Sequence, residues 1–329
     1  MRRIVLLALA LWIPATGLGA TCAGTDLRET LTPDRQAAVA EAAGTHPYPR
    51  GNRWRATRDG RVIDILGTLH LDDPRLDAVS ERFRPAVAAA DLLLVEMAPE
   101  DEAALTASLA ADPSQLLMSG TTTLPMLMDE EDWARLSDEM RMRGIPPAMG
   151  ARMQPWYLSL QLTLPACATE SLAAGTRGLD HRITAMAADA DVPVRSLEDP
   201  ATLFALFADE PLERQARLLR ASLLPPGRGE DMFATLVESY FDERHAEAWE
   251  LSRILAVESV DLPAAEIEAL YAELAEELLF ARNRAWIREI ERAEARNLAL
   301  AFGAAHLFGE DGVLALLERA GYSLTRLDF

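Results

Sequence analysis

The chain has 329 residues, half of them hydrophobic, which is enough to bury one large core or two small ones. Its formal net charge is −20, and an acidic surface of this size repels nucleic-acid phosphates and anionic lipid, so neither is expected as a partner. Every basic side chain is arginine, and the lack of lysine excludes a Walker-type phosphate loop, Schiff-base chemistry and a Ser–Lys dyad.

The first 20 residues have the three parts of a secretory signal. Arg2 and Arg3 form a basic start, residues 4–13 are an unbroken apolar run, and small residues lead up to Ala20. About ten apolar residues are too few to span a bilayer, which needs about twenty. We therefore expect a periplasmic or secreted protein, cleaved near Ala20, with no membrane span after cleavage.

Only two cysteines occur, Cys22 and Cys167, and both lie beyond the expected cleavage site. In an oxidising compartment an isolated pair predicts one disulfide, Cys22–Cys167. Two free buried thiols are the alternative. A metal site built on these two cysteines is disfavoured, because they lack the CxxC spacing.

The remaining elements begin with residues 21–52, an N-terminal extension that contains a predicted helix and a loop in which His46 is expected to be exposed. Asp59-Gly60 lies between two β-prone runs and predicts a hairpin. Apolar residues at helical spacing then predict a helix, and the apolar run 92–95 predicts a buried strand. Strand, helix and strand in this order indicate a parallel βαβ unit.

A long insertion, from about residue 100 to 295, is predicted to be mostly helical, with one short strand at residues 192–197. The chain then returns to a strand at 298–302, a helix and a last strand. The fold class is therefore α/β: a mixed sheet built from strands at both ends of the chain, with a large helical insertion. We expect residues 53–329 to form a single domain.

The same sequence pattern, GxxH between a predicted strand and a predicted helix, occurs in two segments. Gly67-Thr68-Leu69-His70 and Gly303-Ala304-Ala305-His306 each follow a predicted strand and precede a helix, and the glycine allows a sharp turn there. Glu96 closes the strand 92–95 at the same kind of position. Because ligands bind beyond the carboxyl ends of strands in open α/β sheets, we expect His70, Glu96 and His306 to meet at one edge.

Two imidazoles and a carboxylate suit a divalent ion such as Mn²⁺, Co²⁺ or Zn²⁺, with water in a further position. Such an ion would lower the pKa of its water and polarise a substrate carbonyl. Five acids are candidate general bases: Asp72, Asp73, Asp180, Glu198 and Glu310. The alternatives are that each GxxH motif arises by chance and that Glu96 is a helix cap or an exposed loop acid.

Asp180, Arg282 and Asn283 complete the candidate catalytic residues. Asp180 could equally cap the helix that it opens. Arg282 or Asn283 could reach the site as an oxyanion or carboxylate clamp, or could lie on a solvated helix face. His181 and His245 are expected to face solvent.

Taken together and in this order, these motifs resemble the TraB/PrgY/GumN family, which includes the TIKI proteins. The likeness runs from about Trp54 to the C-terminus. One departure follows Leu197-Glu198, where many relatives have a glutamine-containing helix start and this chain has Asp199-Pro200. The matching segments are Gly67 to His70, the strand that ends at Glu96, Gly178 to Asp180, Leu197-Glu198, Arg282-Asn283 with Trp286, and Phe302 to Leu307 with Gly309 and Gly312.

The resemblance implies a fold related to erythromycin-esterase-like and haem-binding ChaN-like proteins, with the paired GxxH motifs and a glutamate as the active centre. Animal TIKI members are metalloproteases that cleave Wnt ligands and prefer Mn²⁺ or Co²⁺. We therefore expect an exported metal-dependent hydrolase that acts on a peptide or protein, with His70, His306 and Glu96 as metal ligands, or with Glu96 as general base. The alternative is a non-catalytic periplasmic protein that binds a peptide, haem or metal.

Overall fold

The computed structural model describes residues 22–173, 178–201, 208, 210–223, 227–259 and 263–329. Its centre is a sheet of six strands in the order β4-β3-β5-β2-β1-β6. β4, β3, β5 and β2 are parallel, whereas β1 is antiparallel to both of its neighbours, so the predicted mixed α/β sheet is confirmed. The strands are β1 (Arg53–Arg58), β2 (Arg61–Thr68), β3 (Leu92–Val95), β4 (Val194–Ser196), β5 (Asn297–Gly303) and β6 (Ser323–Arg326).

The strands follow from apolar runs and one turn. β3 is buried at all four positions and β5 at all but its first, as expected for parallel strands covered on both faces. Asp59 and Gly60 have φ angles of 50° and 78°, so both residues of the β1–β2 turn adopt the left-handed conformation that a tight hairpin needs.

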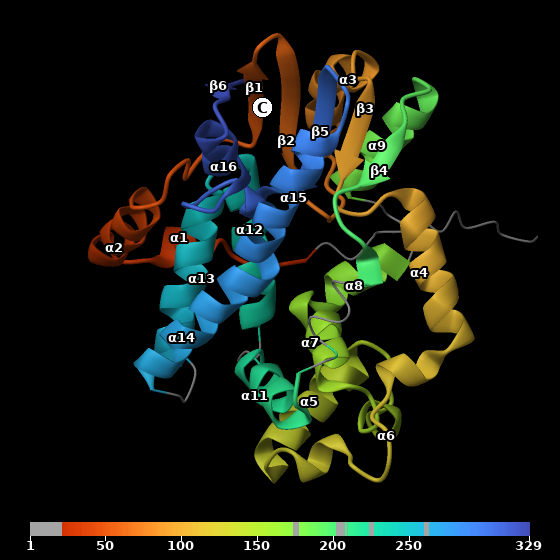
Figure 1. The fold of residues 1–329 in the computed structure, drawn as a ribbon. Coiled ribbons are helices and arrows are strands. Elements are labelled where there is room, and N and C mark those ends of the chain that lie inside the picture. The colour runs from red at the N-terminus through yellow and green to blue at the C-terminus, as the bar shows by residue number, and fades with distance from the viewer. Residues whose placement is uncertain (1–21, 174–177, 202–207, 209, 224–226, 260–262) are drawn as a thin grey trace, which may run out of the picture.

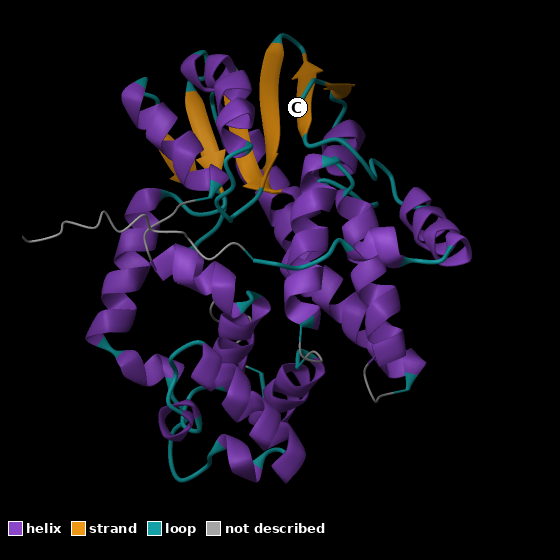
Figure 2. Cartoon of the chain, turned by 180° about the vertical axis from the view of Figure 1, so that it is seen from behind, coloured by secondary structure: helices purple, strands orange, loops and turns teal. Residues whose placement is uncertain are grey.

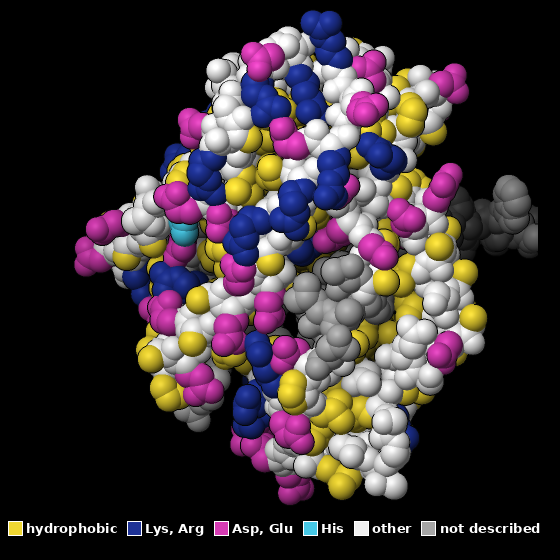
Figure 3. Space-filling view, in the orientation of Figure 1, with side chains coloured by type: hydrophobic (Ala, Val, Ile, Leu, Met, Phe, Trp, Pro, Cys, Tyr) yellow, Lys and Arg dark blue, Asp and Glu magenta, His cyan; other side chains and the backbone are white. Residues whose placement is uncertain are grey.

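Helices cover both faces of this sheet (Figures 1 and 2). α3 and α9 pack together on one face, and α15, with α16 beside it, covers the other, where Trp286 contacts Phe302 of β5. In Figure 3 basic side chains form a row along α15, with acidic side chains beside them. These helices are α3 (Leu76–Ala88), α9 (Leu179–Asp189), α15 (Ala281–Arg292) and α16 (Val313–Arg319).

The helical insertion has a small core of its own, formed by residues such as Leu124, Leu136, Met140, Leu158 and Leu219. It occupies the lower part of Figure 1, away from the sheet. Its elements are α4 (Pro99–Ala111), η1 (Pro113–Leu116), η2 (Leu124–Met126), α5 (Glu130–Met142), α6 (Pro147–Gly150), α7 (Pro155–Thr163), α8 (Ala166–Ala173) and α11 (Leu212–Ala221).

A second helical group connects the insertion back to the sheet. Its elements are α12 (Arg228–Phe241), α13 (His245–Ser259), α14 (Ala264–Ala275) and the π-helical turn η3 (Glu276–Phe280). The short η4 (Ala304–His306) follows β5. α14, η3 and α15 follow one another without a break. The N-terminal helices α1 (Leu27–Thr30) and α2 (Pro33–Gly44) pack on α12 and α13.

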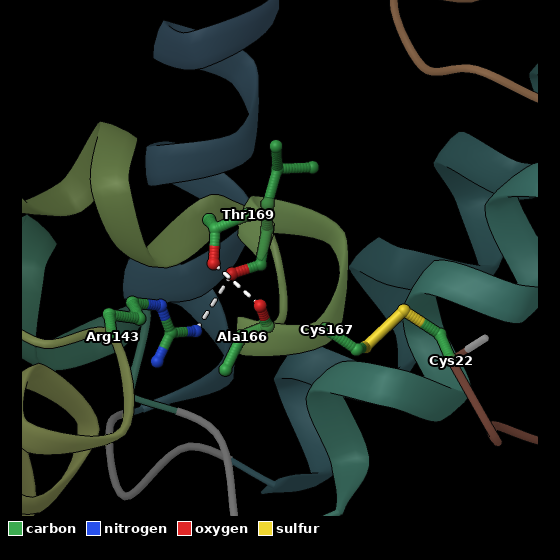
Figure 4. Close-up of a disulfide and its surroundings, with 6 residues drawn as sticks. Cys22, Arg143, Ala166, Cys167 and Thr169 are labelled. Atoms are coloured by element: carbon green, nitrogen blue, oxygen red, sulfur yellow. Dashed lines mark hydrogen bonds between the residues drawn. A yellow bond between two sulfur atoms is a disulfide. The ribbon is translucent and has the colours of Figure 1, made fainter. Parts of the chain in front are cut away.

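The predicted disulfide is present (Figure 4). Cys22 and Cys167 are joined with their Cα atoms 5.4 Å apart, which ties the N-terminal segment to α8. A structural disulfide is typical of an oxidising compartment. The expected signal, residues 1–20, lies outside the described residues. Among the helices that the structure describes, none combines the length and the apolar character needed to cross a bilayer.

Candidate functional site

Four strand ends meet at one edge of the sheet. β2, β5, β3 and β4 are successive parallel neighbours, so their carboxyl ends lie on the same side. Each is followed within three residues by a polar side chain: His70 after β2, His306 after β5, Glu96 after β3 and Glu198 after β4. The expectation that His70, Glu96 and His306 lie on neighbouring strands is therefore met.

The two imidazoles converge on one carboxylate oxygen. His70 Nε2 lies 3.8 Å and His306 Nε2 lies 3.9 Å from the same atom, Glu96 Oε1. The backbone N–H of Gly303 donates to this oxygen at 2.6 Å. A Cβ on Gly303 would lie 3.2 Å from both Glu96 Oε1 and His70 Nε2, so the absence of a side chain there leaves the centre open.

His70 is anchored by a second carboxylate. Its Nδ1 lies 2.7 Å from Asp180 Oδ2, while Thr68 donates its hydroxyl to Asp180 Oδ1 at 2.6 Å. Because a carboxylate accepts, Nδ1 carries the hydrogen and Nε2 is turned toward Glu96. The charge of Asp180 raises the pKa of His70 to about 10. Asp180 is the second residue of α9 and makes no capping hydrogen bond, so the capping interpretation is wrong.

His306 is anchored by an amide instead. Its Nδ1 lies 2.6 Å from Asn283 Oδ1, and the Asn283 amide nitrogen donates to the Asp311 carbonyl at 2.9 Å. This second bond identifies the amide oxygen as the atom that faces His306, so Nδ1 carries the hydrogen and Nε2 keeps its lone pair. The ring also packs against Trp286, with centroids 4.3 Å apart. Burial lowers the pKa of His306 to about 3.

Arg282 binds both carboxylates of the centre, those of Glu96 and Glu198. It donates to Glu96 Oε2 at 2.9 Å, to Glu198 Oε1 at 2.5 Å and 2.9 Å, to the Leu278 carbonyl at 2.8 Å and to His306 Nε2 at 3.3 Å. These contacts occupy all five of its N–H groups. Arg282 is thus a carboxylate clamp, and in this arrangement it has no donor left for a substrate oxyanion.

Glu96 remains ionised in these surroundings. Burial raises its pKa, but the electrostatic interactions with the His306 imidazole, with protonated His70 and with Arg282, together with the Gly303 donor, outweigh this effect and lower the pKa to about 2. A carboxylate that binds protons so weakly is a poor general base near neutral pH but a good metal ligand.

The helix that carries Arg282 and Asn283 changes register just before them. η3 is a single π-helical turn between α14 and α15, and π-turns of this kind occur often at functional sites. Asn283 is fully buried, and the side chain of Arg282 is only 10 % exposed. The alternative, a solvated helix face, is therefore wrong for both residues.

The three central side chains differ in exposure. The His70 side chain is 61 % exposed, whereas those of His306 and Glu96 are 5 % and 18 % exposed. Solvent therefore reaches the centre at His70.

The donor chemistry fits a divalent ion in part. Two imidazoles with fixed Nδ1 hydrogens direct Nε2 at one carboxylate oxygen, and each Nδ1 has the acceptor that metal-bound histidines usually have. However, no three His, Cys, Asp or Glu side chains of the described residues already stand close enough to hold an ion. The guanidinium of Arg282 also faces His306 Nε2. Binding would require the three side chains to draw together.

The other acids considered as general bases are divided between the site and the surface. Asp180 and Glu198 lie in the site. Asp72 pairs with Arg182, Asp73 with Arg75 and Glu310 with Arg319.

The three remaining histidines lie outside the centre. His245 is buried at 7 % exposure between Asn52 and the Tyr48 carbonyl, so the prediction that it faces solvent is wrong. His46 is half-buried and contacts Glu250 at 2.8 Å instead of being fully exposed. The side chain of His181 is 39 % exposed and pairs with Glu102.

Two contacts that the sequence did not predict support the His70 turn. A Cβ on Gly178 would come within 2.3 Å of the His70 carbonyl carbon, and the next N–H, of Leu179, donates to the Leu69 carbonyl at 3.0 Å. Tyr240, buried in α12, donates its hydroxyl to the Gly67 carbonyl at 3.0 Å. The glycine before Asp180 was a signal for the first contact, but no local pattern marks Tyr240.

Comparison with known proteins identifies the family. A family model described as TraB/PrgY/gumN family matches residues 52–326, which is most of the chain. No curated protein matches the sequence. The chain therefore belongs to the TraB/PrgY/gumN family, as the motifs had indicated.

Proposed function

We propose, from membership of the TraB/PrgY/gumN family and from the strand-end centre, that this protein is a metal-dependent hydrolase. His70, His306 and Glu96 would bind one divalent ion of the Mn²⁺, Co²⁺ or Zn²⁺ group. One observation carries the proposal: two imidazoles, each anchored through Nδ1, direct Nε2 at the same oxygen of Glu96 from 3.8 Å and 3.9 Å.

When bound, the ion would supply an activated water molecule and polarise a substrate carbonyl. The protein's own residues do the positioning. Asp180 and Asn283 fix the two imidazoles, and Arg282 with Glu198 fixes Glu96. Burial raises the pKa of Asp180, but its contacts with His70 and Thr68 outweigh this effect and lower the pKa, so this carboxylate positions His70 and is a poor proton acceptor.

The reaction we propose is cleavage of an amide or ester bond, with a peptide as the substrate. Support for a peptide comes from the family resemblance, while the geometry supports hydrolysis more generally. We further propose that the protein is exported to the periplasm or secreted. The signal-like residues 1–20 and the Cys22–Cys167 disulfide support this location.

A non-catalytic binding protein is the second candidate. The observation that favours it is Arg282, a cation that faces His306 Nε2 and occupies the second oxygen of Glu96. If the Arg282 guanidinium occupies the position proposed for the ion, the centre would bind an organic ligand without cleaving it.

The first test is elemental analysis and Mn²⁺ or Co²⁺ titration of the mature protein, beside His70→Ala and His306→Ala. His181→Ala is the matched control, since it removes an imidazole outside the centre. We expect about one ion per chain in the wild type and the control, and loss of binding in both site variants. A peptide-library and ester screen then follows.

Two results would contradict the proposal. Absence of bound ion in the wild type, or equal binding by all four proteins, would leave the binding-protein candidate in its place. An ion that binds as expected but supports no cleavage of any peptide or ester in the screen would restrict the function to metal binding.

A further inference from the structure

A second cavity lies away from the strand-end centre, between α13, α14 and the turn that follows η4. It has a volume of about 150 Å³ and a largely apolar wall. Five rings contribute to this wall: those of His46, Trp249, Tyr271, Phe280 and Phe308. We call it the aromatic pocket.

The rings come from four separate parts of the chain and meet mostly edge to face. Trp249 and Tyr271 have centroids 5.8 Å apart at an interplanar angle of 75°, and His46 and Phe308 are 5.1 Å apart, also at 75°. The faces of aromatic rings carry partial negative charge. Such faces attract cations.

Small residues keep the pocket open. Ala272 and Ala275 lie one turn apart on α14 and line the pocket between the rings. An apolar cavity of about 150 Å³ in another protein accepts benzene, so a group of that girth fits here. A trimethylammonium group is of comparable size.

The charged groups at the rim favour a cation. Arg253 donates from Nε to Glu250 at 2.8 Å, where its Nη2 also forms an ion pair, and from Nη1 to Glu268. Two carboxylates thus share one guanidinium, so the carboxylates of this cluster outnumber its guanidinium. Glu268 is 48 % exposed, and its Oε2 accepts no hydrogen bond from the part of the chain that the structure describes.

We propose that the aromatic pocket binds a small organic cation with a methylated ammonium head. The head lies among the rings of Trp249, Tyr271 and Phe308, and the free oxygen of Glu268 faces its positive charge. The pocket shares a turn with the strand-end centre, because Phe308 lies two residues after His306. The inference is independent of the hydrolase proposal.

The experiment compares two probes of the same shape by calorimetric titration of the folded mature protein. Choline carries the charge, and 3,3-dimethyl-1-butanol is its neutral analogue. We expect choline to bind at least about tenfold more tightly than the alcohol, as cation–π and carboxylate attraction predict. Ionic strength is held constant with sodium chloride.

Three variants test the location. Ala272→Phe fills the pocket from an exposed helix position, and Glu268→Gln removes the rim charge without changing its size. Ala265→Phe is the control, since it adds the same ring at an exposed position of α14 outside the pocket. We expect Ala272→Phe to abolish choline binding, Glu268→Gln to weaken it about tenfold and Ala265→Phe to leave it unchanged.

Equal binding of both probes would overturn the choice of a cation, because the pocket would then select for shape alone. No choline binding at millimolar concentration, or binding that survives Ala272→Phe, would overturn the site itself. Circular dichroism of each variant identifies any protein that has failed to fold. If Ala272→Phe fails to fold, Glu268→Gln, a surface change of equal size, tests the site in its place.

Discussion

The turns Gly67–His70 and Gly303–His306 have the same GxxH pattern and follow adjacent parallel strands, yet their histidines are in opposite environments. His70 is exposed and pairs with a carboxylate, and its pKa is raised. His306 is buried and pairs with an amide, and its pKa is lowered.

The motif therefore determines where an imidazole lies, while the partner of Nδ1 determines its charge. Asp180 makes His70 a cation in the free protein, and Asn283 lets His306 stay neutral with its Nε2 lone pair available. A neutral imidazole is ready to bind a metal, whereas a protonated one must first release its proton. Before either histidine can bind a metal, His70 must therefore lose a proton, whereas His306 need not.

The first prediction concerns the glycine of the second turn, Gly303, whose substitution should reduce hydrolysis and ion binding most. Gly303 has φ −50° and ψ 134°, which alanine adopts without strain. In Gly303→Ala the new methyl would lie 3.2 Å from both Glu96 Oε1 and His70 Nε2, in the middle of the centre. We expect hydrolysis and ion binding to fall by about 100-fold or more, with little change in melting temperature.

Activity assays and metal titration beside a thermal melt check this. Wild-type ion binding by Gly303→Ala would show that the space between the three side chains is not where an ion binds.

The second prediction concerns the residue that accepts the Nδ1 hydrogen bond of each histidine. Leucine replaces Asn283 in one variant and Asp180 in the other. Asn283→Leu leaves the His306 N–H and the Asp311 carbonyl buried without partners, so the free energy of unfolding should fall by about 1–3 kcal/mol. Asp180→Leu should lower it less, because water can reach the exposed His70. Both variants should lose about 10–100-fold in ion affinity.

Urea unfolding and metal titration measure the two quantities separately. Equal losses of stability in the two variants would mean that the burial difference between the turns has no energetic consequence.

Much of this arrangement could be predicted from the sequence. The hairpin at Asp59-Gly60, the buried strand 92–95 and the strand at 298–302 depend on local apolar runs and turn residues, which act over short distances. Parallel pairing then places His70, Glu96 and His306 together, since the carboxyl ends of parallel strands share an edge.

The partners of these residues could not be predicted in the same way. Asn283 faces His306 because the helix changes register at the π-turn Glu276–Phe280, which has no recognisable sequence signal. His245 lies in a charged run, but it is buried by contacts with Tyr48 and Asn52, almost 200 residues earlier in the chain. Such contacts depend on tertiary packing, which local patterns do not encode.

The third prediction concerns the glycine of the first turn. A Cβ on Gly67 would lie 2.6 Å from Leu307 Cδ1 and 3.0 Å from the Ala304 Cα, so Gly67→Ala pushes the two turns apart. We expect the free energy of unfolding to fall by an amount near the lower end of about 1–3 kcal/mol. Hydrolysis should fall less than in Gly303→Ala, because the methyl points at packing atoms and not at the centre.

Denaturant unfolding of the two glycine variants side by side checks this assignment. A Gly67→Ala protein as stable as the wild type, but inactive, would reverse the roles given to the two glycines.

The smallest expected effect is a pH dependence of opposite sign for the two histidines, measured with a chelator present. The folded-state pKa of His306 is lowered, so unfolding lets it bind a proton below its ordinary value of 6.5. Its contribution to stability is therefore present above pH 6.5 and declines as the pH falls toward 3. The folded-state pKa of His70 is raised, so its contribution is full below 6.5 and is lost as the pH rises toward 10.

The measurement is the free energy of unfolding of the wild type minus that of His306→Gln, and likewise for His70→Gln, across pH 6.5. The first difference should shrink by about 1 kcal/mol one pH unit below that value. The second should shrink above it and by less, because solvent screens the exposed His70 pair. Slopes of the same sign would mean that Asp180 and Asn283 impose the same charge state on both imidazoles, and the contrast between the two turns would then be one of exposure alone.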